Sequence, residues 1–254
     1  MFSLDPRGGH NRYKFNKDFF KKWTPEMAYV LGFMYADGDI EDNRESSRTQ
    51  YTTIASVDKG ILEAIKRAMN SDHILNYRGA RNVTYKNGKT YRSAGIYRLR
   101  IGSKEMYEDL LKLGLTPRKS LTIEFPQNIP NQYVGHFIRG YFDGDGCVTI
   151  MRGKGKMGQI ILKGVALIFT SGSKIFLEGL SKKVHEFANF NIRNIYSGSG
   201  AYYLKYSTSE SVEFFKLFYN HASDLFLERK FNVFSNYFQL RPTRKDKTIT
   251  EMLK

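Results

Sequence analysis

The sequence predicts an α+β fold built from two homologous halves, each running helix, two strands, helix, two strands, helix, with antiparallel sheets. Three observations predict it: a repeated segment that contains Asp-Gly, a repeated Arg-Lys segment behind it, and one order of helical and β-type segments between the two. We expect the halves at residues 24–125 and 133–240, joined by a linker at 126–132. A basic extension at 1–23 and a tail at 241–254 flank them.

The main evidence for two halves is the repeated segment at each predicted first helix. It reads AYVLGFMYADGDI at residues 28–40 and HFIRGYFDGDGCV at residues 136–148, in both cases an apolar stretch with an internal glycine, then Asp-Gly and β-type residues. The Arg-Lys pairs in LTPRKSLTI (115–123) and FLERKFNVF (226–234) follow at nearly equal distances. A spacing shared by two separate segments is typical of an internal repeat.

The segments between these anchors follow one order in both halves. β-type residues end near 52–56 and 166–171, and an amphipathic helix then begins behind Asp58 or Ser173, whose side chains suit an N-cap. Further strands are expected at 74–75, 96–101, 192–196 and 202–206, and final helices near Ser103 and Ser209. Each half therefore has the elements of an antiparallel sheet covered by helices.

Small residues are predicted to line one face of each first helix. Since residues four apart share a helix face, the two stripes are Ala28, Gly32 and Ala36, and His136, Gly140 and Gly144. A glycine inside a helix costs roughly 1 kcal/mol relative to alanine. Its recurrence at the matching place is explained if Gly32 and Gly140 let the two helices pack closely against each other.

Asp37 and Asp145 each lie at the end of one of these helices, so close packing is expected to bring their carboxylates together. An anion at a helix C-terminus is unfavourable by about 0.3–1 kcal/mol, and neighbouring carboxylates repel further. A divalent cation held by carboxylate, carbonyl and water oxygens removes both penalties. A single Asp-Gly would be interpreted as a helix stop with a left-handed glycine, but the repeat favours a metal site suited to phosphodiester hydrolysis.

The charge balance indicates an acidic partner. The 254 residues include 40 Lys and Arg against 25 Asp and Glu, a net charge of +15, and nucleic acid fits this surplus better than a membrane. The single cysteine, Cys147, excludes an intramolecular disulfide and is expected to be a small packed side chain. No long apolar run occurs, so we expect a soluble intracellular protein, in bacterial or phage-infected cytoplasm or in an organelle.

VLGFMYADG (30–38) and IRGYFDGDG (138–146) together resemble the two motif copies of the single-chain LAGLIDADG homing endonucleases. The resemblance implies a pseudo-twofold pair of αββαββα half-domains, with the motif helices packed at the centre and two antiparallel sheets forming a DNA-binding saddle. It implies a monomer that binds double-stranded DNA and makes double-strand breaks at a long asymmetric target, in the homing of an intron or other mobile element. The implied cofactor is Mg²⁺, as two or three divalent ions; Mn²⁺ can substitute, and Ca²⁺ supports binding without cleavage.

The same resemblance implies metal-binding roles for particular residues. Asp37 and Asp145 are the implied catalytic acids and metal ligands, assisted by the backbone carbonyls of Ala36 and Gly144. Asp143, an aspartate without a counterpart in the first half, is expected to be structural rather than a third ligand.

One catalytic lysine per half is also implied, which helps to position the hydrolytic water or to stabilise charge. Lys119 and Lys230 are the candidates. Their neighbours Arg118 and Arg229 stay open as alternatives, because an alignment of two halves does not fix the register here.

Basic residues on the predicted strands are expected to bind DNA. In YRLRI (97–101), alternation puts Arg98 and Arg100 on the face opposite the apolar residues. A sheet with such a face can enter a major groove, where Arg reads guanine and Gln reads adenine. The expected contacts are Arg44, Arg48, Gln50, Arg98, Arg100, Arg152, Lys154, Lys156, Lys163 and Lys205.

Two other functions fit the same scaffold. One is a DNA-binding regulator that does not cleave, but binding alone does not need converging carboxylates. The other is an intron maturase that binds structured intron RNA, with or without nuclease activity. The chain shows no flanking splicing block, so we expect a free-standing enzyme rather than an intein.

Overall fold

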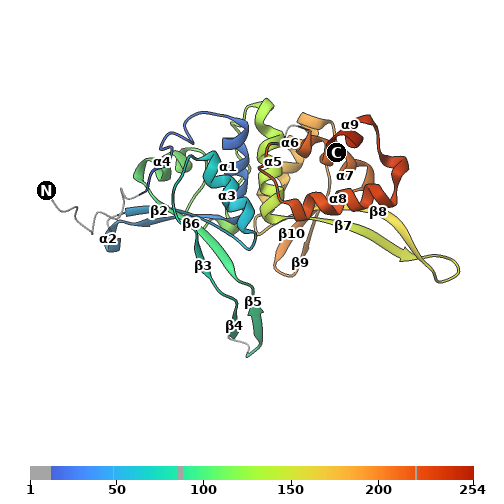
Figure 1. Cartoon of the computed structure of the whole chain (residues 1–254), viewed down its shortest axis with the longest axis horizontal. Coiled ribbons are helices and arrows are strands. Elements are labelled where there is room, and N and C mark those ends of the chain that lie inside the picture. The colour runs from blue at the N-terminus through green and yellow to red at the C-terminus, as the bar shows by residue number, and fades with distance from the viewer. Residues whose placement is uncertain (1–12, 48, 85–87, 221) are drawn as a thin grey trace. The chain divides into compact units, whose positions relative to one another are not determined.

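A computed structural model describes residues 13–47, 49–84, 88–220 and 222–254 of the chain (Figure 1). The chain divides into two units: one takes in the residues up to Trp23 and Asp37–Arg118, the other Thr24–Ala36 and Lys119–Lys254. The helix expected to open the first half therefore groups with the second unit. Within the described ranges, no helix combines the length and apolar character needed to cross a membrane.

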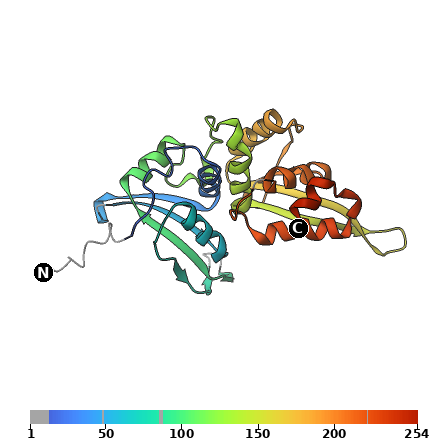
Figure 2. The same ribbon diagram turned by 45° about the horizontal axis from the view of Figure 1, so that its top comes forward.

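The first unit is built on a four-stranded antiparallel sheet of order β1-β2-β6-β3, with α3 packed on β2 and β6 and α4 on β2 (Figures 1 and 2). Strands β4 and β5 pair with each other in a separate two-stranded sheet. The elements in chain order are β1 (Gly38–Asn43), α2 (Arg44–Ser47), β2 (Thr49–Ser56), α3 (Lys59–Ala68), β3 (Asn76–Arg78), β4 (Arg81–Thr84), β5 (Thr90–Ser93), β6 (Ile96–Gly102) and α4 (Lys104–Lys112).

The second unit has a four-stranded antiparallel sheet of order β7-β8-β10-β9, and α5, α6, α7 and α8 all contact it. Its elements are α1 (Pro25–Asp37), whose last residue counts with the first unit, η2 (Lys119–Leu121), α5 (Asn131–Asp145), β7 (Gly146–Lys154), β8 (Ile160–Ser171), α6 (Lys174–Ala188), β9 (Ile195–Gly198), β10 (Ala201–Tyr206), α7 (Thr208–Tyr219), α8 (Glu228–Leu240), η3 (Pro242–Arg244) and α9 (Lys247–Met252).

The two sheets share one topology. If β4 and β5 are set aside, both have the strand order first, second, fourth, third, and all pairs are antiparallel. In both, the first strand begins directly after a motif helix, at Gly38 or Gly146. This confirms the α+β class and the repeated order of elements that the sequence predicts.

The two sheets differ in their hairpins. In the second unit only Ser199 and Gly200 separate β9 from β10, whereas the corresponding connection between β3 and β6 carries β4 and β5. Conversely, β7 and β8 have nine and twelve residues, against six and eight in β1 and β2. The long hairpin β7–β8 contains a register shift between Met151 and Arg152.

Period-two burial shows which face of the first sheet is solvent-exposed. On β6, Leu99 and Ile101 are buried while Arg98 and Arg100 are exposed. Every second residue of β2, from Gln50 to Ser56, is also buried. Because successive side chains point to opposite faces, the helices cover one face and the arginines lie on the other.

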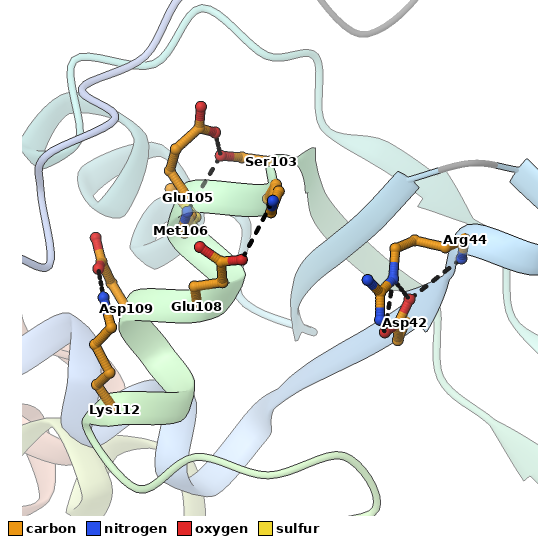
Figure 3. A network of polar contacts seen from close by, with 9 residues as sticks. Asp42, Arg44, Ser103, Glu105, Met106, Glu108, Asp109 and Lys112 are labelled. Atoms are coloured by element: carbon orange, nitrogen blue, oxygen red, sulfur yellow. Dashed lines mark hydrogen bonds and ion pairs between the residues drawn. The ribbon is translucent and has the colours of Figure 1, made fainter.

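Helix ends follow local capping rules. Ser103 accepts a hydrogen bond from the Met106 backbone N–H at 3.2 Å and donates to Glu105 Oε2 at 2.9 Å, at the start of α4 (Figure 3). Ser173 caps α6 through a backbone N–H at 3.3 Å, as its sequence predicts. Such caps satisfy N–H groups that a helix leaves open.

Helices α1 and α5 pack with their backbones in direct contact. A Cβ atom on Gly32 would fall on the backbone carbonyl of Phe137, and one on Gly140 on the carbonyl of Tyr29. Residues Met27–Tyr35 of α1 are buried throughout. The contact needs glycine at both places, which accounts for grouping α1 with the second unit.

The described part of the N-terminal extension, from residue 13, and the C-terminal tail both pack against the rest of their units. In the N-terminal extension Phe19 and Phe20 are buried, and Lys14 donates its backbone N–H to Asp72 at 2.6 Å. Residues 241–254, expected as a tail, instead form η3 and α9. Asp246 caps α9 by accepting the Ile249 backbone N–H at 2.8 Å, and the Ile249 side chain is fully buried.

We expect Gly140→Ala to destabilise the second unit by about 3 kcal/mol or more, because the new methyl group must push two backbones apart. Gly60→Ala on α3 is the matched control, since a Cβ there meets nothing within 4 Å. It should be neutral or stabilising by about 0.5–1 kcal/mol. Urea denaturation of the two variants measures the difference, and equal midpoints would contradict the close helix contact.

Candidate active site

Each motif helix ends in an exposed aspartate. Asp37 is the last residue of α1, and Asp145 is the last residue of α5. Gly146 has φ −93° and ψ 163°, which is extended backbone rather than the left-handed conformation of a glycine helix stop. The chain therefore passes straight from helix into strand, and the carboxylate of Asp145 stands at this junction.

Lys230 contacts the C-terminal end of α5. This lysine on α8 is 3% exposed, and its ammonium donates to the carbonyls of Phe142, of Asp143 at 2.8 Å and of Gly146 at 2.7 Å. An ammonium has three donors, so these three bonds use all of them. A positive charge here opposes the partial negative charge of the helix terminus.

Lys119 has the corresponding place at the end of α1. Its side chain is 6% exposed, and Nζ donates to the Ala36 carbonyl at 3.3 Å. By contrast Arg118, with φ +56°, and Arg229 on α8 are exposed. The lysines rather than the neighbouring arginines are thus the side chains directed at the helix ends.

The carbonyls expected to assist a metal differ between the halves. The Ala36 carbonyl accepts a hydrogen bond from the Lys119 ammonium, whereas Lys230 donates to the carbonyls of Phe142, Asp143 and Gly146. Sequence reasoning placed a metal ion at both carbonyls and did not foresee lysine in this role. The signal was present in the repeat itself, because Lys119 and Lys230 follow the two helices at nearly equal distances.

Asp143 is buried in the second unit. Its Oδ2 accepts hydrogen bonds from the Tyr29 hydroxyl at 2.8 Å and from the Leu227 backbone N–H at 3.0 Å. Desolvation raises the pKa of this carboxyl to about 6, although Lys230 and the two hydrogen bonds act in the opposite direction. The carboxyl thus joins α5 to α1 and to the start of α8, which supports a structural role.

Arg139, a buried charged residue on α5, also donates its hydrogen bonds to backbone carbonyls. It is 2% exposed and donates to Phe218 O at 2.7 Å and Leu225 O at 3.1 Å. Burial lowers the pKa of its guanidinium. Since Phe218 lies in the last turn of α7, Arg139 stabilises a helix C-terminus in the way that Lys230 does.

On the first sheet, the predicted DNA contacts are presented unequally. Arg98 and Arg100 lie on the exposed face, and Arg100 forms an ion pair with Glu41 at 2.8 Å and lies 4.0 Å from the Tyr51 ring centroid. Gln50, by contrast, is buried at 5% exposure, because alternation along β2 directs its side chain towards the core face. The structure thus does not present Gln50 as a groove-reading residue.

The connection between β1 and β2 holds two further candidates. Arg44 begins the short helix α2 rather than lying on a strand, and its guanidinium pairs with Asp42 at 2.6 Å (Figure 3). Arg48 lies outside the described residues.

On the second sheet, all the predicted basic contacts are exposed. They are Arg152, Lys154, Lys156 and Lys163 on the β7–β8 hairpin and Lys205 on β10. Cys147, expected to be packed, is exposed instead, because Val148 takes the buried position on β7. Cys147 pairs with Ile168, which pairs with Lys205, so the three share the exposed face.

Lys230→Met should lower the free energy of unfolding by about 3 kcal/mol, because three carbonyls lose a buried charged donor. Lys119→Met removes a longer bond, of 3.3 Å to the Ala36 carbonyl, and should cost about 1 kcal/mol. Urea denaturation compares the pair, and Lys182→Met on the exposed side of α6 controls for loss of charge. A larger effect at Lys119 would contradict the capping role of Lys230.

Asp143→Asn should make stability less dependent on pH. A carboxyl whose folded pKa is raised, here from 3.8 to about 6, holds its proton more tightly in the folded state. Its contribution therefore falls as pH rises from about 4 to about 6. The stability of the Asn variant relative to the native chain should rise over this window, by up to about 3 kcal/mol. Thermal unfolding at pH 4.5 and pH 7.5 measures it, and a constant difference would contradict the raised pKa.

Two sequence comparisons match parts of the chain. Residues 132–217 match the family model of the LAGLIDADG-like domain. A stretch of 169 residues, 66% of the chain, is 29% identical to part of the DNA-directed RNA polymerase subunit Rpo1C of Methanocaldococcus jannaschii. The match spans 16% of the length of that protein.

Solved structures match along most of the chain. The homing endonuclease I-WcaI bound to its DNA recognition sequence aligns with a TM-score of 0.56 at 15% identity, over 91% of this chain and 95% of that one. The LAGLIDADG meganucleases I-AabMI and I-CpaMI, each bound to uncleaved DNA, align at TM-scores of 0.53 and 0.51, with 13% and 11% identity. Both cover 91% of this chain, and 96% and 97% of their own. Residues 132–217 are therefore similar to the LAGLIDADG-like domain, and the chain has the fold of the LAGLIDADG homing endonucleases.

Proposed function

We propose that this chain is a site-specific DNA endonuclease that breaks both strands of a long asymmetric target by Mg²⁺-dependent phosphodiester hydrolysis, in the homing of an intron or other mobile element. The observation that carries the proposal is the repeated helix end: Asp37 and Asp145 are exposed carboxylates, and Lys119 and Lys230 contact the same two termini. The DNA-bound state of structures with this fold supports it.

Two carboxylates fit a hard divalent cation whose remaining ligands are water and substrate phosphate. Within the described ranges, no group of three or more His, Cys, Asp or Glu could hold a metal ion. Mg²⁺ commonly binds through one or two carboxylates and completes its shell with water and substrate phosphate. Asp37 and Asp145 would supply the carboxylates. Such an ion activates water and stabilises the leaving oxygen.

The two lysines would act as fixed positive charges. Lys230 already donates to three carbonyls, so we assign it a role in stabilising the C-terminal end of α5 rather than in proton transfer. Lys119 would have the same role at Ala36. Each places a cation near the helix end where an exposed aspartate meets DNA phosphate, which stabilises negative charge there.

DNA binding would use the exposed faces of both sheets. Arg98, Arg100 and Lys205 lie on those faces, and the β7–β8 hairpin adds Arg152, Lys154, Lys156 and Lys163. Phosphate contacts of this kind make affinity fall steeply with salt. Because Arg100 is paired with Glu41, DNA must compete with that carboxylate for the guanidinium.

Asp37→Asn and Asp145→Asn should each abolish double-strand cleavage or reduce it to nicking, since each acid would serve one strand. Supercoiled DNA carrying a site selected from a genomic library is the substrate, with Mg²⁺, Mn²⁺ and Ca²⁺ compared. Glu251→Gln, on the exposed side of α9, is the control and should cut normally. Undiminished cutting by both aspartate variants would overturn the proposal.

Binding assays with DNA and RNA, run beside the cleavage assay, separate the alternative functions. Tight binding of one DNA sequence without cleavage in any of these ions would favour the regulator. Preferential binding of structured intron RNA would favour the maturase, for which the comparisons offer no support.

A further inference from the structure

Arg139 lies on a motif helix at a place where the first half has an apolar residue. The motif repeat aligns it with Leu31, which is fully buried. Arg139 is 2% exposed, so α5 buries a positive charge there, which is costly unless the charge is paired and hydrogen-bonded. Its bond to the Phe218 carbonyl stabilises the end of α7, but its second bond, to the Leu225 carbonyl, serves another segment.

Leu225 belongs to the short stretch that leads into α8. Its carbonyl accepts a hydrogen bond from Arg139 Nε at 3.1 Å, and two residues later the Leu227 backbone N–H donates to Asp143 at 3.0 Å. Both leucine side chains are buried. Arg139 and Asp143 are four residues apart on α5, so their side chains share a helix face. One face of α5 therefore holds this stretch at two points.

Lys230 follows in the first turn of α8. Its backbone N–H donates to the Leu227 carbonyl at 3.0 Å, and Leu227, an apolar residue, provides no side-chain cap for the helix start. The place of Lys230 is thus set by the residues before it. Its ammonium donates in turn to carbonyls at the end of α5, among them Asp143 at 2.8 Å and Gly146 at 2.7 Å. The contacts therefore run from α5 through the stretch before α8 to Lys230, and back to the end of α5.

The groups around Arg139 fix its orientation. The guanidinium lies 5.1 Å from the Tyr29 ring centroid, and the Tyr29 hydroxyl donates to Asp143 at 2.8 Å. An aromatic face and a carboxylate four residues along the helix both attract a guanidinium. The planar fork of donors is thereby held in one orientation, from which it bonds two carbonyls at once.

We propose that Arg139 is a positioning residue of the second half: it holds Leu225 so that the first turn of α8 presents the Lys230 ammonium to the end of α5. The proposal rests on the proposed endonuclease function in so far as Lys230 serves catalysis. It makes the two halves unequal, because Leu31 has no side-chain group that could donate a hydrogen bond. The first half thus positions Lys119 without an equivalent of this arginine.

Amine labelling of the whole chain tests the proposal without relying on activity. Lys230 and Lys119 are 3% and 6% exposed, so both should react slowly with an acetylating reagent in the native chain. In Arg139→Leu, which introduces the residue type of the first half, loss of a charge-assisted hydrogen bond should speed acetylation of Lys230 by about tenfold or more and leave Lys119 little changed. Mass spectrometry of the digested chain measures both sites. Equal acceleration of the two lysines would indicate general loosening of the unit and overturn the proposal.

Two further variants complete the labelling experiment. Ile249→Ala removes a fully buried side chain on α9 of the same unit, so it should affect both lysines alike. Arg139→Lys keeps the buried charge but lacks the planar fork that bonds two carbonyls at once, so Lys230 should react at a rate between those of the native chain and Arg139→Leu. This variant decides the question if Arg139→Leu does not fold. A native rate at Lys230 in Arg139→Lys would then refute the positioning role.

Strand-resolved cleavage separates this inference from the proposed function. If each half serves one strand, Arg139→Leu should slow cleavage of the strand that Asp145→Asn leaves uncut, by about tenfold relative to the other strand, and nicked DNA should accumulate. A duplex that contains the selected site, labelled on either strand and cut in Mg²⁺, measures both rates. Equal slowing of both strands refutes the positioning role alone. Failure of the native chain to cut any duplex refutes the proposed function, and the labelling rates then decide the role of Arg139.

Discussion

The close approach of α1 and α5 at Gly32 and Gly140 is the constraint on which the second unit depends. Each glycine faces a backbone carbonyl of the other helix, so no side chain fits between them. Asp143 accepts a hydrogen bond from the Tyr29 hydroxyl between the same two helices, and Arg139 lies 5.1 Å from the Tyr29 ring centroid. The sequence repeat and the packing consequently divide the chain differently: α1 belongs to the first half by homology and to the second unit by contact.

Electrostatics at the helix ends follows from that packing. A buried helix terminus keeps its partial negative charge, and each motif adds an aspartate there. Buried lysine ammonium groups offset this charge by donating to the carbonyl of Ala36 and to those of Phe142, Asp143 and Gly146. The carboxylates of Asp37 and Asp145 are exposed. The lysine ammonium groups thus supply part of the positive charge that the sequence analysis assigned to a metal ion.

Features that follow a fixed sequence period could be predicted from the sequence. Features that depend on packing between distant segments could not. Alternation predicted the exposed Arg98 and Arg100, and the repeat predicted that both halves share one order of helices and strands along the chain. The same alternation places Gln50 on the buried face of β2, where the structure has it, although its amide is chemically suited to reading adenine. Helix α9 was missed because its six residues hold little apolar content, and its order comes from burying Ile249. The segment between β3 and β6 gave no apolar pattern, and the described residues of β4 and β5 are mostly exposed.

The halves diverge where packing leaves them free. The motif helices fix each other through backbone contact, and a side chain added at either glycine would separate them. The hairpins differ between the units: the first unit lengthens β3–β6 through β4–β5, and the second lengthens β7–β8 past the register shift between Met151 and Arg152. Both additions are basic, but they extend different hairpins of one topology. The proposed asymmetric target would suit such a chain, because the two sheets that would bind DNA carry different hairpins.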